Sequence, residues 1–154
     1  MIERRTRRKL RRGRGNSYAN TGGVFPRRRF AGKSVKGRML EDIVLLETRF
    51  ALPSSPNPFD GFGVFKLQFA SGEFDMVVCD NAKRTCRLFE IKHSGVAVEA
   101  QRRHLVDEAK LRFVRERLGD IDARTVLYRG DDMVLADGIR YRNVNSFLTS
   151  LSTP

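Results

Sequence analysis

The segment GEFDMVVCDNAKRTCRLFEIKHS, residues 72–94, constrains the fold of this chain more than any other stretch. Its two short apolar runs flank a polar turn, which is typical of a β-hairpin. A four-residue loop, Asn81–Arg84, aligns residues whose numbers add up to 165. In this register Asp75 faces Glu90, and Glu73 faces Lys92. The open end of the predicted hairpin is therefore crowded with charge.

The rest of the hairpin is suited to a core. One face is expected to carry only apolar side chains, namely Phe74, Met76, Val78, Phe89 and Ile91. On the charged face, the same register sets Val77 against Leu88, and Cys79 against Cys86 close to the turn. We expect the two cysteines to be buried free thiols, although this register also permits a disulfide.

Two carboxylates directly across a ladder destabilise a sheet unless something neutralises them. A divalent cation does so, and Mg²⁺ favours carboxylate oxygens while it keeps positions for water and phosphate. Lys92 is expected to orient or deprotonate a water, since partial burial and a nearby cation lower the pKa of a lysine. Asp75, Glu90 and Lys92 therefore predict a site for phosphodiester hydrolysis. The alternative is that they form ordinary ion pairs at a strand end.

The remaining periodicities predict an α/β chain. Residues 37–52 read as a helix with Glu41 in its first turn and a buried stripe of Met39, Leu40, Ile43, Val44, Leu46 and Phe50. After it we expect a loop over 53–63, a strand over 64–69, the hairpin, a helix over 97–118, a strand over 123–130, a short strand pair over 131–142 and a helix over 143–151. The residues expected to face inward from the second helix are Val98, Leu105, Ala109, Phe113 and Leu118.

The positive charge of the chain is concentrated before residue 39. The sequence has 30 Lys and Arg against 18 Asp and Glu, and residues 1–38 contain 14 of the basic side chains but only one acid, Glu3. We interpret residues 1–35 as a basic, flexible arm that contacts nucleic-acid phosphates. A solubilising tail or a linker is the alternative. The candidate contacts are Arg4, Arg5, Arg7, Arg8, Lys9, Arg11, Arg12, Arg27, Arg28 and Arg29.

Nothing in the sequence indicates secretion or a membrane partner. The basic start is not followed by an apolar stretch of seven or more residues, and no 18-residue apolar run occurs. We expect a cytoplasmic chain, with organelle targeting as a less favoured alternative because serine is sparse. The stretch AGKS at 31–34 resembles the end of a phosphate-binding loop, but Arg27 stands where a glycine is required. No nucleotide cofactor is therefore predicted.

Several motifs in one order resemble a known family. Asp75, fourteen intervening residues and EIK at 90–92, with Glu41 upstream on a helix, resemble the PD-(D/E)XK nuclease superfamily. The segments GRMLEDIVLLETRF, SGEFDMVVCD, LFEIKHSG and TVLYRGDDMVLADGIRYRNVNSFL are similar, in that order, to the restriction-endonuclease-like C-terminal domain of many bacterial and archaeal AAA-type ATPases. The likeness covers residues 36–148, and the ATPase half is missing.

The resemblance implies a single domain over 36–154, folded as a restriction-endonuclease-like α/β/α sandwich with a central mixed sheet and the core order α-β-β-β-α-β. It also implies that Asp75 and Glu90 hold Mg²⁺ or Mn²⁺. Glu41 would bind a second ion or its water shell, and Lys92 would serve the attacking water. These four residues, Glu41, Asp75, Glu90 and Lys92, form the predicted catalytic set.

Other polar residues are assigned ordinary roles. Gln101, Arg102 and Arg103 are expected on a solvated helix face, although the superfamily often places a polar residue near the scissile phosphate there. His93 and His104 are expected at the surface or at a packing boundary, and Tyr128 in the core.

Three functions are compatible with these observations, the third being a basic nucleic-acid or protein-binding module unrelated to nucleases. The favoured one is a metal-dependent nuclease, acting on DNA in preference to RNA, whose basic arm holds the backbone. The alternative is a non-catalytic nucleic-acid-binding or regulatory module related to the C-terminal domain of AAA-type ATPases, for which a separate ATPase chain is a candidate partner. The sequence makes no prediction of the oligomeric state.

Overall fold

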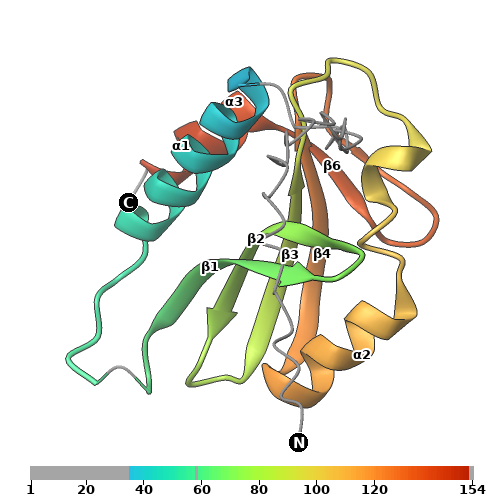
Figure 1. Cartoon of the computed structure of the whole chain (residues 1–154). Helices are drawn as coiled ribbons and strands as arrows, with labels where there is room; N and C mark the ends of the chain where they lie inside the picture. The colour runs from blue at the N-terminus through green and yellow to red at the C-terminus, as the bar shows by residue number, and fades with distance from the viewer. Residues whose placement is uncertain (1–34, 58, 153–154) are drawn as a thin grey trace, which may run out of the picture. The chain divides into compact units, whose positions relative to one another are not determined.

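The computed structural model describes residues 35–57 and 59–152, which belong to one compact unit, Lys33–Pro154. In this unit a mixed six-stranded sheet lies between helices on its two faces (Figure 1), which confirms the predicted α/β class. The elements in chain order are α1 (Val35–Ala51), β1 (Phe62–Phe69), β2 (Gly72–Asp80), β3 (Thr85–Ile91), η1 (Glu99–Arg102), α2 (Glu108–Arg117), β4 (Asp120–Tyr128), β5 (Met133–Val134), β6 (Arg140–Asn143) and α3 (Val144–Leu151).

The strands lie in the order β1-β2-β3-β4-β6-β5. The pairs β1–β2, β2–β3 and β5–β6 are antiparallel, whereas β3–β4 and β4–β6 are parallel. The predicted hairpin register is confirmed at Cys79–Cys86, but the ladder between β2 and β3 ends at Met76–Phe89. Both cysteines are buried free thiols, as expected, and burial raises the pKa of each.

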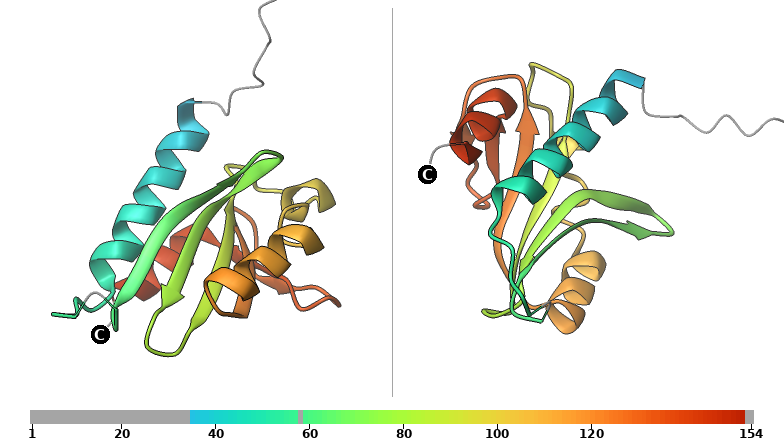
Figure 2. Two further views of the ribbon diagram at one scale, coloured as in Figure 1. Left: turned by 60° about the horizontal axis from the view of Figure 1, so that its bottom comes forward. Right: turned by 90° about the vertical axis from the view of Figure 1, so that its left-hand side faces the viewer.

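The core has two clusters, one on each face of the sheet. Helices α1 and α3 lie side by side on one face, and α2 lies on the other (Figure 2). Val44 of α1 and Phe147 of α3 pack on the first face with Met76, Val78, Phe89, Ile91 and Leu127. Leu111 and Val114 of α2 pack on the second face with Val77, Cys79, Cys86, Leu88, Val126 and the predicted core residue Tyr128.

A β-bulge interrupts the pairing of β1 with β2. Phe65 pairs with Val77 and Leu67 with Phe74, so two residues of β2, Asp75 and Met76, oppose Lys66 alone. The extra residue reverses the alternation of side chains beyond it. Phe74 consequently packs on Phe69, which itself contacts Phe113 of α2. The prediction that Phe74 shares a face with Met76 is therefore wrong, because the bulge was not visible in the sequence.

Helix α1 buries a narrower stripe than predicted. Val44 is fully buried and Leu40 packs partly against the core, but the side chains of Met39, Ile43, Leu46 and Phe50 are between 47% and 79% exposed. The inward positions are instead Glu41, Val44 and Thr48. Since the helix begins at Val35, Glu41 lies in its second turn, which corrects its predicted place in the first. A polar residue thus occupies a core-facing position.

The predicted helix over 97–118 is divided into η1 and α2. A new helix begins after Asp107, whose carboxylate accepts hydrogen bonds from the backbone N–H groups of Ala109 (3.1 Å) and Lys110 (3.3 Å). The break changes which residues face inward: Leu105, Lys110, Leu111 and Val114 are buried, whereas Val98, Ala109 and Phe113 are exposed and Leu118 is partly buried. No described helix is both long and apolar enough to cross a membrane.

Candidate metal centre

Charged side chains from β2 and β3 meet where the two strands separate. The ammonium group of Lys92, just after β3, lies 2.9 Å from Oδ2 of Asp75 and 2.5 Å from Oε2 of Glu90. Asp75 Oδ2 also accepts a hydrogen bond from the backbone N–H of Ile91 at 2.8 Å. Asp75 and Glu90 do not form the predicted ladder pair, because the ladder has ended before them. The Ile91 N–H of β3 thus donates to the Asp75 carboxylate of β2 and not to a backbone carbonyl.

Three carboxylates form a cluster that could hold a metal ion. One oxygen from each of Glu41, Glu73 and Asp75 lies within 4.8 Å of the other two. Glu41 and Asp75 are buried, with 3% and 1% of their surface exposed, and Glu73 is partly buried. Oxygen ligands at such spacing suit a hard divalent cation. The cluster joins α1 to the beginning of β2.

Glu73 belongs to this cluster and was not among the predicted site residues. The expected register paired it with Lys92, but Lys92 bonds to Asp75 and Glu90 instead. The bulge explains the difference, since it turns Phe74 toward α2 and leaves the neighbouring Glu73 on the side of α1. Its position among the charges at the open end of the hairpin was the only sequence signal for Glu73.

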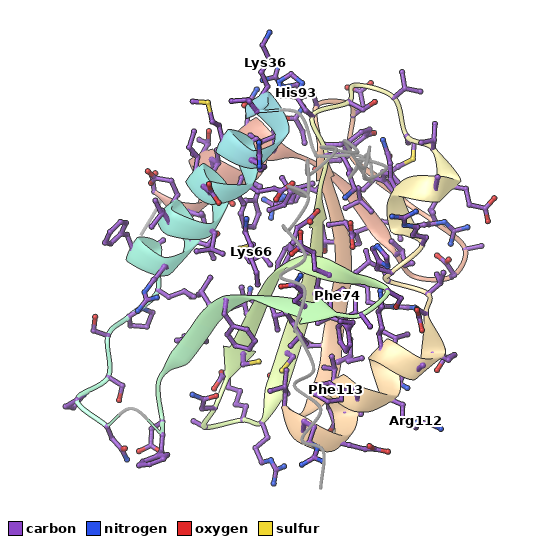
Figure 3. The ribbon with its side chains drawn as sticks, in the orientation of Figure 1. Lys36, Lys66, Phe74, His93, Arg112 and Phe113 are labelled. Atoms are coloured by element: carbon purple, nitrogen blue, oxygen red, sulfur yellow. The ribbon has the colours of Figure 1, made fainter. Side chains whose placement is uncertain are left out.

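Lys66 is a second cation beside the cluster that the sequence reasoning missed. Its ammonium group lies 3.4 Å from Oε2 of Glu41 and 3.0 Å from Oδ1 of Asp42. Figure 3 shows Lys66 between α1 and the β1–β2 hairpin. In the sequence, Lys66 was only one of the polar residues that alternate with apolar ones in a predicted strand. The contact therefore depends on the way α1 crosses β1.

Glu90 has an oxygen that is buried without a partner. Its Oε1 atom accepts no hydrogen bond from the described residues, although Glu90 is only 1% exposed. Burial, followed by the charge of Asp75, raises the pKa of Glu90 to about 7, and Lys92 offsets only part of this effect. A buried carboxylate oxygen without a donor is costly, and a bound cation would relieve that cost. Glu90 is not one of the three clustered carboxylates, and its side chain contacts Lys92.

The pKa of Lys92 is raised, not lowered as the sequence suggested. Burial opposes its positive charge, but the negative charges of Asp75 and Glu90 outweigh burial. In the protein without a cation, Lys92 is therefore a charged donor and not a base. The expectation of a lowered pKa assumed a nearby cation and did not include the two carboxylates in direct contact.

The segment from residue 96 to residue 110 contacts the beginning of β2 through His104. Gln101 is buried, and its side chain donates to the carbonyl of Val96 and accepts from the N–H of Val98. It therefore does not lie on the solvated helix face that we expected. The half-buried His104 covers Gly72, where a Cβ atom would lie 2.6 Å from the imidazole ring. Lys110 contacts Nδ1 of His104 at 2.6 Å.

The other predicted residues do not join the cluster. Arg102 pairs with Asp137 and Glu99, and Arg103 contacts Nε2 of His104. His93 is exposed, in agreement with a surface role. The ten basic residues proposed as phosphate contacts, Arg4 to Arg29, lie outside the described residues.

Comparison with known proteins gave no family for this chain. No family model matches it, and neither the curated proteins nor the solved structures contain a significant match.

Proposed function

We propose that this chain is a metal-dependent nuclease of the PD-(D/E)XK type, which hydrolyses phosphodiester bonds in nucleic acid, with DNA as the favoured substrate. The observation that carries the proposal is the cluster of Glu41, Glu73 and Asp75 beside the charged Lys92. The succession α1-β1-β2-β3-α2-β4 supports a restriction-endonuclease-like sandwich. The expected place of action is the cytoplasm.

The donor set fits a hard divalent cation such as Mg²⁺ or Mn²⁺. Glu41, Glu73 and Asp75 would hold it, and Oε1 of Glu90 offers a further buried oxygen. When bound, such an ion lowers the pKa of water and stabilises negative charge on a phosphate that is being transferred.

The chain's own residues would position the reactants. Asp75 is held rigidly by the Ile91 N–H and by Lys92, so its carboxylate is oriented before a substrate arrives. Lys92 is best suited to orient a water molecule or a phosphate oxygen by donating hydrogen bonds, since it carries its proton in the site as folded. Lys66 is placed to meet the negative charge of a strand that approaches α1.

Cleavage of plasmid and single-stranded DNA in Mg²⁺ or Mn²⁺ tests this function. We expect metal-dependent cutting that falls by about 100-fold or more in Asp75→Asn and Lys92→Gln. Asp75→Asn retains an oxygen to accept from the Ile91 N–H, so the fold should persist. The matched control is Asp122→Asn, which neutralises an exposed carboxylate on β4 and should cut within about twofold of the parent.

Cutting that survives in Asp75→Asn would exclude this site as its origin. If the protein binds DNA but no metal supports cutting, the non-catalytic binding or regulatory module is the better assignment. Melting temperatures of all variants, measured without metal, show whether lost activity reflects lost structure.

A further inference from the structure

A small basic pocket lies on the sheet face that carries α3. Its volume is about 110 Å³, and it is lined by Arg87 of β3, by Thr125 of β4, by Arg140 and Arg142 of β6, and by Phe147 of α3. Arg87 and Arg142 are half-buried and Arg140 is exposed. None of the lining residues is acidic. Three guanidinium groups thus share one pocket without a carboxylate in its wall.

Strand alternation explains why the three arginines share this face. Phe89 packs on the side of α3, so Arg87, two residues earlier on β3, points the same way. Tyr141 packs on the α2 side, and its neighbours Arg140 and Arg142 therefore face α3. The parallel register sets Arg87 beside Ala123 and Arg140 beside Thr125. Ala123 and Thr125 on β4 are small, so they leave space between Arg87 on β3 and Arg140 on β6.

The positive charge of this pocket is not neutralised within the described part of the chain. Neither Arg87 nor Arg140 forms an ion pair with a described carboxylate, whereas Arg102 has two such pairs and Arg115 has one. Arg142 is held by Ser150, to which it donates a hydrogen bond at 3.0 Å, and by the Phe147 ring at 5.4 Å. Arginine remains charged at any ordinary pH. The arrangement is suited to a bound anion.

We propose that this pocket binds a phosphate group on a nucleic-acid strand, at a second contact separate from the metal centre. Guanidinium groups match phosphate oxygens in pairs. The volume is below the roughly 300–1,000 Å³ of pockets that enclose drug-sized ligands, which favours a single phosphate of a longer chain. The choice of nucleic acid as the phosphate carrier rests on the proposed function.

Binding measured with a chelator separates this contact from cleavage. Fluorescence anisotropy would follow a labelled DNA duplex and its single strand, mixed with the full chain in EDTA over a series of salt concentrations. For Arg87→Gln/Arg140→Gln we expect about tenfold weaker binding at moderate salt, and a dependence of log K on log salt that is shallower by about two. Loss of cutting activity would not affect this readout.

The matched control removes the same charge from the other face of the unit. Arg112 and Arg117 are exposed on α2, and Arg112→Gln/Arg117→Gln should change the affinity by less than about twofold and leave the salt slope unchanged. The single change Arg140→Gln alters only an exposed side chain. It should lower the salt slope by about one even if the double variant proves unstable.

Equal losses in the two double variants would overturn the proposal, because they would indicate a diffuse effect of net charge. So would an unchanged salt slope in Arg140→Gln. Inorganic phosphate and pyrophosphate serve as competitors. If they bind the parent chain and not Arg87→Gln/Arg140→Gln, while DNA binding is equal in both proteins, the pocket takes free phosphate and the assignment to nucleic acid is wrong.

Discussion

Lys92 donates a hydrogen bond to Oδ2 of Asp75 at 2.9 Å, at a point where the ladder between their strands has already ended. The same oxygen accepts from the Ile91 N–H, so one carboxylate joins β2 to β3 by side-chain contacts. The contact therefore holds the chain just after β3 against β2 beyond the end of their ladder.

Glu90 should make the stability of the metal-free protein depend on pH. Its pKa is raised from 4.5 to about 7 by burial and by Asp75, so the folded state binds a proton more tightly than the unfolded state. The resulting stabilisation is complete below about pH 4.5 and is lost as the pH rises through about 7, with a loss of about 3 kcal/mol at most. Urea unfolding in EDTA between pH 5 and pH 8 measures this loss.

The variant Glu90→Gln should flatten that pH profile, since it has no proton to lose. Glu47→Gln, which alters an exposed carboxylate on α1, should leave the profile as in the parent. The free energy of unfolding of the parent minus that of Glu90→Gln should be smaller at pH 8 than at pH 5. An equal difference at the two pH values would contradict the raised pKa.

Divalent cations should stabilise the folded chain through the carboxylate cluster. At ten times the dissociation constant, a bound ion adds about 1.4 kcal/mol to the free energy of unfolding. Thermal melts with and without Mg²⁺ or Mn²⁺ should show this rise in the parent and in Glu47→Gln. Glu73→Gln should lose most of it, because it removes one of the three clustered oxygens. An equal rise in Glu73→Gln would place the ion elsewhere.

Replacement of Lys66 should tighten metal binding. Its ammonium group lies 3.4 Å from Glu41, where it competes with a cation for the same carboxylate. Lys66 is one-third exposed, so water screens the pair, and we expect Lys66→Gln to raise the affinity only about two- to fivefold. Isothermal titration with Mn²⁺ measures the change. Lys36→Gln, at the exposed beginning of α1, is the control and should bind as the parent does.

The two apolar sides of α1 should differ in their effect on stability. Val44 is fully buried, and Val44→Ala should lower the free energy of unfolding by about 2 kcal/mol through lost burial and an unfilled cavity. Phe50 is the larger side chain but is 79% exposed, so Phe50→Ala should change the free energy of unfolding by less than about 0.5 kcal/mol. Chemical denaturation gives both values. A larger loss for Phe50→Ala would show that its face of α1 is covered in solution.

Local patterns in the sequence were sufficient for the hairpin ladder from Met76–Phe89 to the turn and for the final helix. Lys92 does contact Asp75 and Glu90, but beyond the end of the ladder and not in the predicted pairing. Both elements depend on neighbours within about 20 residues, where the periods of strands and helices determine which side chains share a face. The break before α2 was also encoded locally, since Asp107 is a good N-cap residue. The apolar residues on both sides of Asp107 follow helical spacing, so the sequence pattern indicated one continuous helix and not a break.

The sequence by itself determined an α/β chain with a charged hairpin end, because side-chain alternation and turn chemistry act over short distances. Only the tertiary structure decided that Glu73 joins Glu41, that Lys66 lies beside them and that three arginines share a pocket. A bulge of one residue reverses a strand's faces, and the crossing of a helix over a sheet depends on the packing of the whole core. Neither leaves a local pattern in the residues that it brings together.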